Sequence, residues 1–107
     1  MGKQSVVATV YDKQGNVVSV GYNSYIKTHP LQAKLACRCG QPEKVYLHAE
    51  IAALVKARGR GYKIRVERFN KHGDPMLAAP CPICNLAIEM AGIEIVEFTT
   101  GGCLCDA

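Results

Sequence analysis

Residues 80–98 read PCPICNLAIEMAGIEIVEF, and this stretch decides the fold of the second half of the chain. Its first part predicts a helix over 81–91 that Gly92 ends. Its second part, rich in β-branched residues, predicts a strand over 93–98. The helix is expected to bury one apolar stripe, made up of Ile83, Leu86, Ala87 and Met90. A helix that leads directly into a strand is a typical unit of an α/β fold.

The start of this helix carries a pair of cysteines that indicates a metal site. Cys81 and Cys84 are three residues apart, so both thiolates project from the same face of the first helical turn. Two thiolates at this spacing are typical ligands of zinc. Because Pro-Cys-x-x-Cys is rare by chance, the pair is a specific signal.

A second short motif, His48-Ala49-Glu50, completes the pattern. His48, at the start of a second predicted helix over 48–58, can supply a third zinc ligand and leave the fourth position open for water, as in catalytic zinc sites. Glu50 is too close to His48 in sequence to be a natural fourth ligand, but it can reach that water. H-x-E followed by P-C-x-x-C marks zinc-dependent nucleobase deaminases.

The first half of the chain predicts a β-hairpin and one helix. Residues 5–11 and 17–21 are strand-like and flank a turn over 12–16. Pro30 can open a helix that ends before Gly40. A strand is expected over 62–69, with Lys63, Arg65 and Glu67 on its solvent face, and residues 76–79 either pair back or lead into the site. This order predicts an α/β fold with a mixed sheet of four to five strands and helices on both faces.

Length and composition indicate one domain. The 107 residues suit a single unit over 1–107, and residues 99–107 read as a loose tail. No apolar run approaches the ~20 residues of a membrane span. The apolar stretch near the start of the sequence is too short for a secretory signal. We therefore expect a cytoplasmic protein without membrane contact.

The chain has six cysteines, and two readings of the four outside the zinc motif remain open. Cys37, Cys39, Cys103 and Cys105 could form a second, structural metal site. Free thiols are the favoured reading, since chelating pairs usually have two to four residues between them. In either case a reducing compartment fits better than a disulfide scaffold. A further alternative joins Cys81 and Cys84 to Cys37 and Cys39 in a purely structural zinc site.

The net charge of +4 comes largely from the segment KARGRGYKIRVER, residues 56–68. A basic surface here would suit a phosphate-bearing substrate or a nucleic acid. The alternative is ordinary: cations near a helix C-terminus offset the helix dipole, and others cover the solvent face of a strand. Tyr22, Tyr25 and Phe69 could stack on a base, although packing also explains them, and His29 and His72 read as solvated loop residues.

From about Val6 to Phe98 the chain resembles the cytidine and deoxycytidylate deaminase superfamily. The likeness includes Gly21-Tyr22-Asn23, His48-Ala49-Glu50 and residues 80–98, and it is strongest to the deoxycytidylate deaminase branch. The tRNA adenosine deaminases share similar elements. The resemblance implies a three-layer helix–sheet–helix sandwich with a five-stranded sheet.

The resemblance also implies roles for individual residues. His48, Cys81 and Cys84 would bind Zn²⁺, and Glu50 would shuttle protons. Asn23 would hydrogen-bond the sugar of the substrate, and the backbone N–H of Ala49 would contact the pyrimidine carbonyl.

The expected function is hydrolytic deamination of a cytosine nucleoside or nucleotide, with dCMP favoured. The alternatives are a deaminase of bases in single-stranded DNA or RNA, including tRNA adenosine, and a non-catalytic, zinc-stabilised binding module. The link between strand and helix over residues 69–80 looks longer than the corresponding link in relatives. Nothing after residue 98 reads as a fifth strand with its helix. An uncovered sheet edge predicts a homo-oligomer, and the substrate stays open between these classes.

Overall fold

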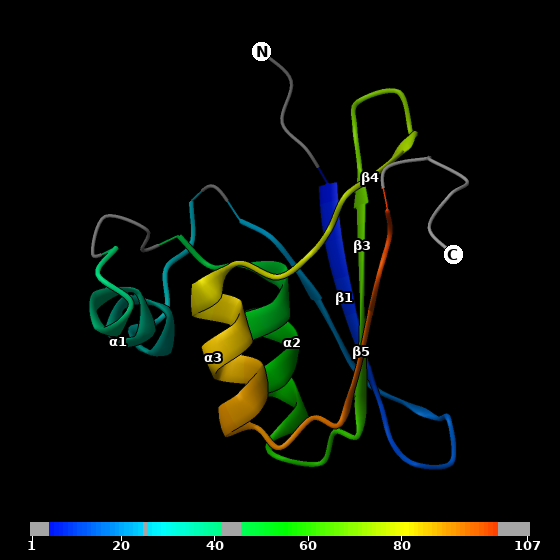
Figure 1. The fold of residues 1–107 in the computed structure, drawn as a ribbon, viewed down its shortest axis with the longest axis horizontal. Coiled ribbons are helices and arrows are strands. Elements are labelled where there is room, and N and C mark those ends of the chain that lie inside the picture. Colours follow the sequence, from blue (N-terminus) through cyan, green and yellow to red (C-terminus); the bar gives the residue numbers. More distant parts are fainter. Residues whose placement is uncertain (1–4, 25, 42–45, 101–107) are drawn as a thin grey trace.

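The computed structural model describes residues 5–24, 26–41 and 46–100 (Figure 1). Its elements are, in chain order, β1 (Ser5–Tyr11), β2 (Val17–Tyr22), α1 (Pro30–Arg38), α2 (Ala49–Ala57), β3 (Lys63–Phe69), β4 (Pro75–Met76), α3 (Pro82–Met90) and β5 (Ile95–Phe98). Every helix and strand expected from the sequence is present, with ends that differ by one or two residues. Of residues 76–79, Met76 pairs back onto β3 as part of β4, whereas residues 77–79 are not in a strand and lead toward the cavity that Ala78 and Ala79 line.

The strands form one mixed sheet, as expected for this fold class. The order is β2-β1-β3-β4, and β5 also pairs with β3. The β3–β5 pair is parallel and the other pairs are antiparallel. The β1–β2 turn is held by Asp12, whose Oδ1 accepts hydrogen bonds from the backbone N–H groups of Gln14 and Asn16. Gly15 adopts the positive φ of 87° that this turn requires.

All three helices lie on the same side of the sheet in Figure 1, whereas we expected helices on both faces. The residues beneath them are small or β-branched and fully buried: Ala8, Val10, Ile64 and Val66. The opposite face carries Lys63, Arg65 and Glu67, which form ion pairs among themselves and with Glu97. This charged face is suited to solvent, so the described residues form two layers instead of a three-layer sandwich.

Helix α2 packs unusually close to the sheet at Gly21 of β2. A methyl group on Gly21 would lie 2.4 Å from the backbone nitrogen of Ala53 and 2.5 Å from the carbonyl oxygen of Ala49. Beside this contact, the Ser19 hydroxyl donates a 2.7 Å hydrogen bond to the carbonyl oxygen of Ala53. The absence of a side chain at Gly21 therefore sets the distance between α2 and the sheet.

The buried stripe of α3 differs from the expected one. Ile83 and Ala87 are buried as predicted, but Cys84 and Ile88 join them and Met90 is 57% exposed. The reason is tertiary packing: α3 packs against both α1 and α2, and Cys84 and Ile88, one turn apart, lie on the face that this packing buries. In α2, Val55 is likewise exposed at its surface while Ile51 and Leu54 are buried.

Thr99 is not part of a loose tail. Its backbone N–H donates to the carbonyl of Val66, its hydroxyl donates to the carbonyl of Met76, and its carbonyl accepts from the N–H of Ala78. Residues 101–107 lie outside the described part of the chain. Within that part, no helix has the length and apolar character needed to cross a membrane. Exposed apolar residues such as Val96 and Phe98 mark the β5 edge, and the homo-oligomer expected from such an edge stays a prediction.

Gly21→Ala is expected to destabilise the protein by about 1–3 kcal/mol, the usual cost of overpacking a filled interior. The added methyl group must push α2 away from β2, because the nearest atoms belong to the helix backbone. Urea denaturation measures the change, with Lys34→Ala on the exposed surface of α1 as the control. Equal stability of the wild type and the Gly21→Ala variant would show that α2 does not need this close approach.

Candidate functional site

Helices α2 and α3 begin at the same end of the molecule, and their first residues carry the motifs singled out in the sequence (Figure 1). His48 is the N-cap of α2, and Cys81 is the N-cap of α3. Pro82 occupies the first turn of α3, where its missing N–H costs nothing. Cys84 follows in the same turn and is fully buried. The two helix starts therefore bring together side chains that are distant in sequence.

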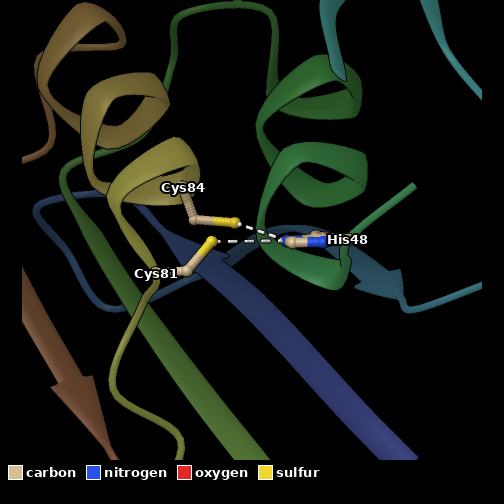
Figure 2. A group of neighbouring side chains, drawn as sticks. All are labelled: His48, Cys81 and Cys84. Atoms are coloured by element: carbon tan, nitrogen blue, oxygen red, sulfur yellow. Dashed lines mark hydrogen bonds between the residues drawn. The ribbon is translucent and has the colours of Figure 1, made fainter. Parts of the chain in front are cut away.

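Figure 2 shows His48, Cys81 and Cys84 pointing toward one another. The Nδ1 atom of His48 lies 3.2 Å from Sγ of Cys84 and 3.6 Å from Sγ of Cys81. The three ligand atoms all lie within 4.8 Å of one another.

These distances fit a tetrahedral zinc ion. Zinc bonds of about 2.3 Å to sulfur and about 2.0–2.1 Å to nitrogen place neighbouring nitrogen and sulfur ligands about 3.5 Å apart. One imidazole and two thiols also make up a zinc donor set that leaves a fourth position for water or substrate. The predicted Zn²⁺ cofactor is confirmed: His48, Cys81 and Cys84 are close enough to hold it.

The two cysteines have opposite proton affinities. A hydrogen bond from Cys84 lowers the pKa of Cys81 to about 3, with a further contribution from His48. The same hydrogen bond, together with burial, raises the pKa of Cys84. Zinc binds cysteine as the thiolate, so a proton held on Cys84 must leave when zinc binds. The positive ends of the α2 and α3 dipoles favour this gain of negative charge.

Glu50 lies in the first turn of α2 and is only 7% exposed. Burial raises its pKa above the ordinary value, because the charged carboxylate loses contact with water. Nearby Cys81 adds to this effect, and a hydrogen bond with Cys84 opposes it. A carboxylate with a raised pKa beside a metal site is suited to accept and return a proton near neutral pH.

Two of the metal ligands, His48 and Cys81, and Glu50 line a cavity of about 430 Å³. Both residues predicted to contact substrate line it: Ala49 is fully buried, and Asn23 is half-buried. The side-chain oxygen of Asn23 accepts a hydrogen bond from the N–H of Val6, which fixes its carboxamide at the end of β1. The other lining residues are Val6, Ser24, Tyr46, Leu47, His48, Glu50, Arg68, Ala78, Ala79 and Cys81.

Three residues at or beside the site were missed in the sequence. Gln32 of α1 is fully buried, and its Oε1 accepts a 3.1 Å hydrogen bond from the backbone N–H of His48. Its position three residues before Leu35 and four before Ala36 is the signal that places it on the buried stripe of α1. Tyr46 and Arg68 line the cavity. For Arg68 the signal is its position in the strand: it lies an even number of residues from Ile64 and Val66, so its side chain is on the same face of the sheet.

Other candidate residues lie away from the cavity. Cys37 is exposed and Cys39 half-buried near the end of α1, and Cys103 and Cys105 lie outside the described residues, so the second metal site stays a prediction. Among the residues that the structure describes, the one group of metal-binding side chains joins Cys81 and Cys84 to His48, which does not favour their pairing with Cys37 and Cys39 in a structural site.

The aromatic and histidine candidates are also resolved in part. Tyr22 is 61% exposed, and neither it nor Phe69 lines the cavity. Tyr25 lies outside the described residues. His29 is the N-cap of α1, where its Nδ1 accepts a hydrogen bond from the N–H of Leu31, so it has a structural role that we did not expect.

Zinc content tests the ligand set. Wild-type protein is expected to bind one zinc ion per chain at this site, and Cys84→Ser is expected to lose it because one of three protein ligands is removed. Elemental analysis after gel filtration measures the ratio, with Cys37→Ser as the matched control. Full zinc content in Cys84→Ser would exclude this ligand set, whereas a second ion lost in Cys37→Ser would support the second site.

Gln32→Leu is expected to weaken zinc binding by about tenfold or more, the scale found for residues that orient metal ligands. The substitution leaves the N–H of His48 without this acceptor and frees the N-cap of α2 to shift. Competition with a chromophoric chelator measures the affinity, and Gln14→Leu in the exposed β1–β2 turn is the control. Unchanged zinc affinity in Gln32→Leu would remove Gln32 from the support of the site.

Comparison with known proteins agrees with this geometry. The family profile for the cytidine and deoxycytidylate deaminase zinc-binding region matches residues 1–100. No curated protein sequence matches the chain significantly. The matched region contains the whole sheet, all three helices and the His48, Cys81 and Cys84 group. The chain belongs to the cytidine and deoxycytidylate deaminase zinc-binding family.

Proposed function

We propose that this zinc-dependent deaminase acts on a free cytosine nucleotide, with dCMP as its substrate, and releases ammonia and the uracil nucleotide. The observation that carries the proposal is the cavity of about 430 Å³, which is lined by the zinc ligands His48 and Cys81 and by the buried Glu50. This volume lies in the usual range for small-molecule sites, about 300–1,000 Å³. A metal site at the wall of a cavity, with a proton carrier beside it, is suited to hydrolysis at a ring carbon.

Glu50 is proposed to move the protons of the reaction. Zinc at this position supplies Lewis-acid activation of water at neutral pH. The Glu50 carboxylate accepts a proton from the attacking water and passes it to the ring nitrogen of cytosine. It then takes the second proton, from the hydroxyl group now bonded to the ring carbon, and delivers it to the amino group, so that the bond from the ring carbon to nitrogen breaks, the carbonyl of uracil forms and ammonia leaves. One carboxylate can serve every step because it is not a metal ligand.

Ala49 and Asn23 are proposed to orient the substrate. The backbone N–H of Ala49 lies in the first turn of α2, where N–H groups have no acceptor within the helix, and it can donate to the pyrimidine carbonyl. Asn23 lies at the cavity wall with its carboxamide held by Val6, and it is assigned the contact with the sugar. Both contacts would hold the reactive carbon against the zinc site.

The arrangement of the basic residues favours a mononucleotide over a polynucleotide. Lys56 donates to the carbonyl of Val20, and Lys63 and Arg65 lie in ion pairs on the opposite sheet face. In the described part of the segment 56–68, Arg68 is the residue that lines the cavity. A strand of nucleic acid would need a continuous basic track, which this distribution does not favour. A reducing, cytoplasmic setting suits the four described cysteines, because none of them forms a disulfide.

Glu50→Gln is expected to retain zinc and to lose about 10²- to 10⁴-fold in turnover of dCMP, the range of a general acid–base contribution. Ammonia release measures turnover, with zinc content determined in parallel. Glu89→Gln on the exposed surface of α3 is the matched control and should keep both.

The substrate is tested in the same assay with dCMP, cytidine, adenosine and short single strands. Near wild-type ammonia release by Glu50→Gln would exclude the assigned role. Turnover of a single strand without turnover of any monomer would replace the mononucleotide with a polynucleotide substrate, and its activity would fall steeply with salt.

A further inference from the structure

Arg68 is the cation of strand β3 that faces the helices. Its side chain lies on the same face of the strand as those of Ile64 and Val66, which are fully buried under α2. Across the sheet it pairs with Val6 of β1, and Val6 is in turn hydrogen-bonded to Asn23. Arg68 therefore reaches the cavity wall at the end of the sheet where Asn23 also lies.

The guanidinium of Arg68 has few partners. Its Nη1 lies 3.5 Å from the carbonyl oxygen of Leu77, and its Nε is shielded from solvent with no hydrogen-bond acceptor. Within the described residues, no carboxylate lies within 4 Å of it. A shielded donor without an acceptor is costly, so the free energy of the complex would improve if a ligand supplied an anionic acceptor.

Arg65 of the same strand provides the contrast. It lies on the opposite face of the sheet, where its guanidinium pairs with Glu97 at 3.3 Å and with Glu67 at 3.9 Å. The positive charge of Arg65 is thus compensated within the protein, whereas that of Arg68 is not.

The cavity itself has the charge pattern of a nucleotide site. Its described ionisable lining residues are Tyr46, His48, Glu50, Arg68 and Cys81, and three of these, His48, Glu50 and Cys81, belong to the metal site and its proposed proton carrier. Arg68 is the permanent cation among them. Asn23 and Arg68 flank Val6, so a ligand that extends from the metal site past Asn23 can meet the guanidinium.

We propose that Arg68 binds the 5′-phosphate of the substrate, so that the enzyme acts on a cytosine mononucleotide in preference to the corresponding nucleoside. The proposal rests on the proposed function and adds the group that selects the substrate class. Arginine offers a fork of N–H donors that matches phosphate geometry. The phosphate would supply the acceptor that the guanidinium lacks.

The test compares Arg68→Gln with its matched control Arg65→Gln on two substrates, dCMP and deoxycytidine. Arg68→Gln is expected to lower kcat/KM for dCMP by about 10- to 100-fold, the scale of a lost charge-assisted hydrogen bond, and to leave kcat/KM for deoxycytidine nearly unchanged. Arg65→Gln is expected to change neither. Arg68→Lys, which retains the charge but not the fork, should recover part of the activity on dCMP.

Equal losses on both substrates, or no loss on dCMP, would overturn the role of Arg68 while leaving the deaminase assignment intact. If wild-type protein turned over neither substrate, the proposed function would fail, and binding of dUMP measured by calorimetry would decide on Arg68 alone. Weaker dUMP binding by Arg68→Gln than by Arg65→Gln would support the phosphate contact, and equal or absent binding would exclude it. Zinc content and thermal melting confirm that each variant is folded, and Arg68→Lys replaces Arg68→Gln in the comparison if the latter does not fold.

Discussion

The close contact between α2 and β2 at Gly21 is the constraint on which the site depends. The backbone of Ala53 approaches this glycine more closely than any side chain would permit, and the Ser19 hydroxyl holds the same helix residue. Because α2 is rigid over its nine residues, this contact also sets the distance between its first turn and the sheet. His48, Ala49 and Glu50 occupy that turn, so the sheet determines where a metal ligand and the buried Glu50 carboxylate lie.

The second helix start is brought to the first by burial as well as by ligand chemistry. Cys84 is fully buried between α2 and α3, together with Ile83 and Ala87 of the same helix. Gln32 adds a polar contact from α1 to the backbone of His48. The zinc site is therefore surrounded by packing from all three helices, which holds the donor atoms near their tetrahedral spacing. This packing also buries the carboxylate of Glu50 and the thiol of Cys84, and both groups have raised pKa values.

The sequence predicted the elements well because their signals are local. The alternation of Lys63, Arg65 and Glu67 with apolar residues identified β3 and its solvent face, and the cysteine and histidine motifs identified the metal ligands. Met90 was placed wrongly because the buried face of α3 is set by its packing against α1 and α2, which the local sequence does not show. The parity of Arg68 was visible in the sequence, but its entry into the cavity depends on the pairing of β3 with β1. Such pairing between distant segments has no local signal, and neither has the placement of all helices on one face.

Thr99 connects three strands through one residue. It donates hydrogen bonds to the carbonyl oxygens of Val66 in β3 and Met76 in β4, and it directly follows β5. Its own carbonyl accepts a hydrogen bond from the N–H of Ala78 in the cavity wall. The segment that leads from β4 to Cys81 is thus braced by the end of the last strand. The rim of the cavity and strand β5 are therefore coupled through Thr99, so a substitution in β5 is expected to change the shape of the cavity without altering a residue that lines it.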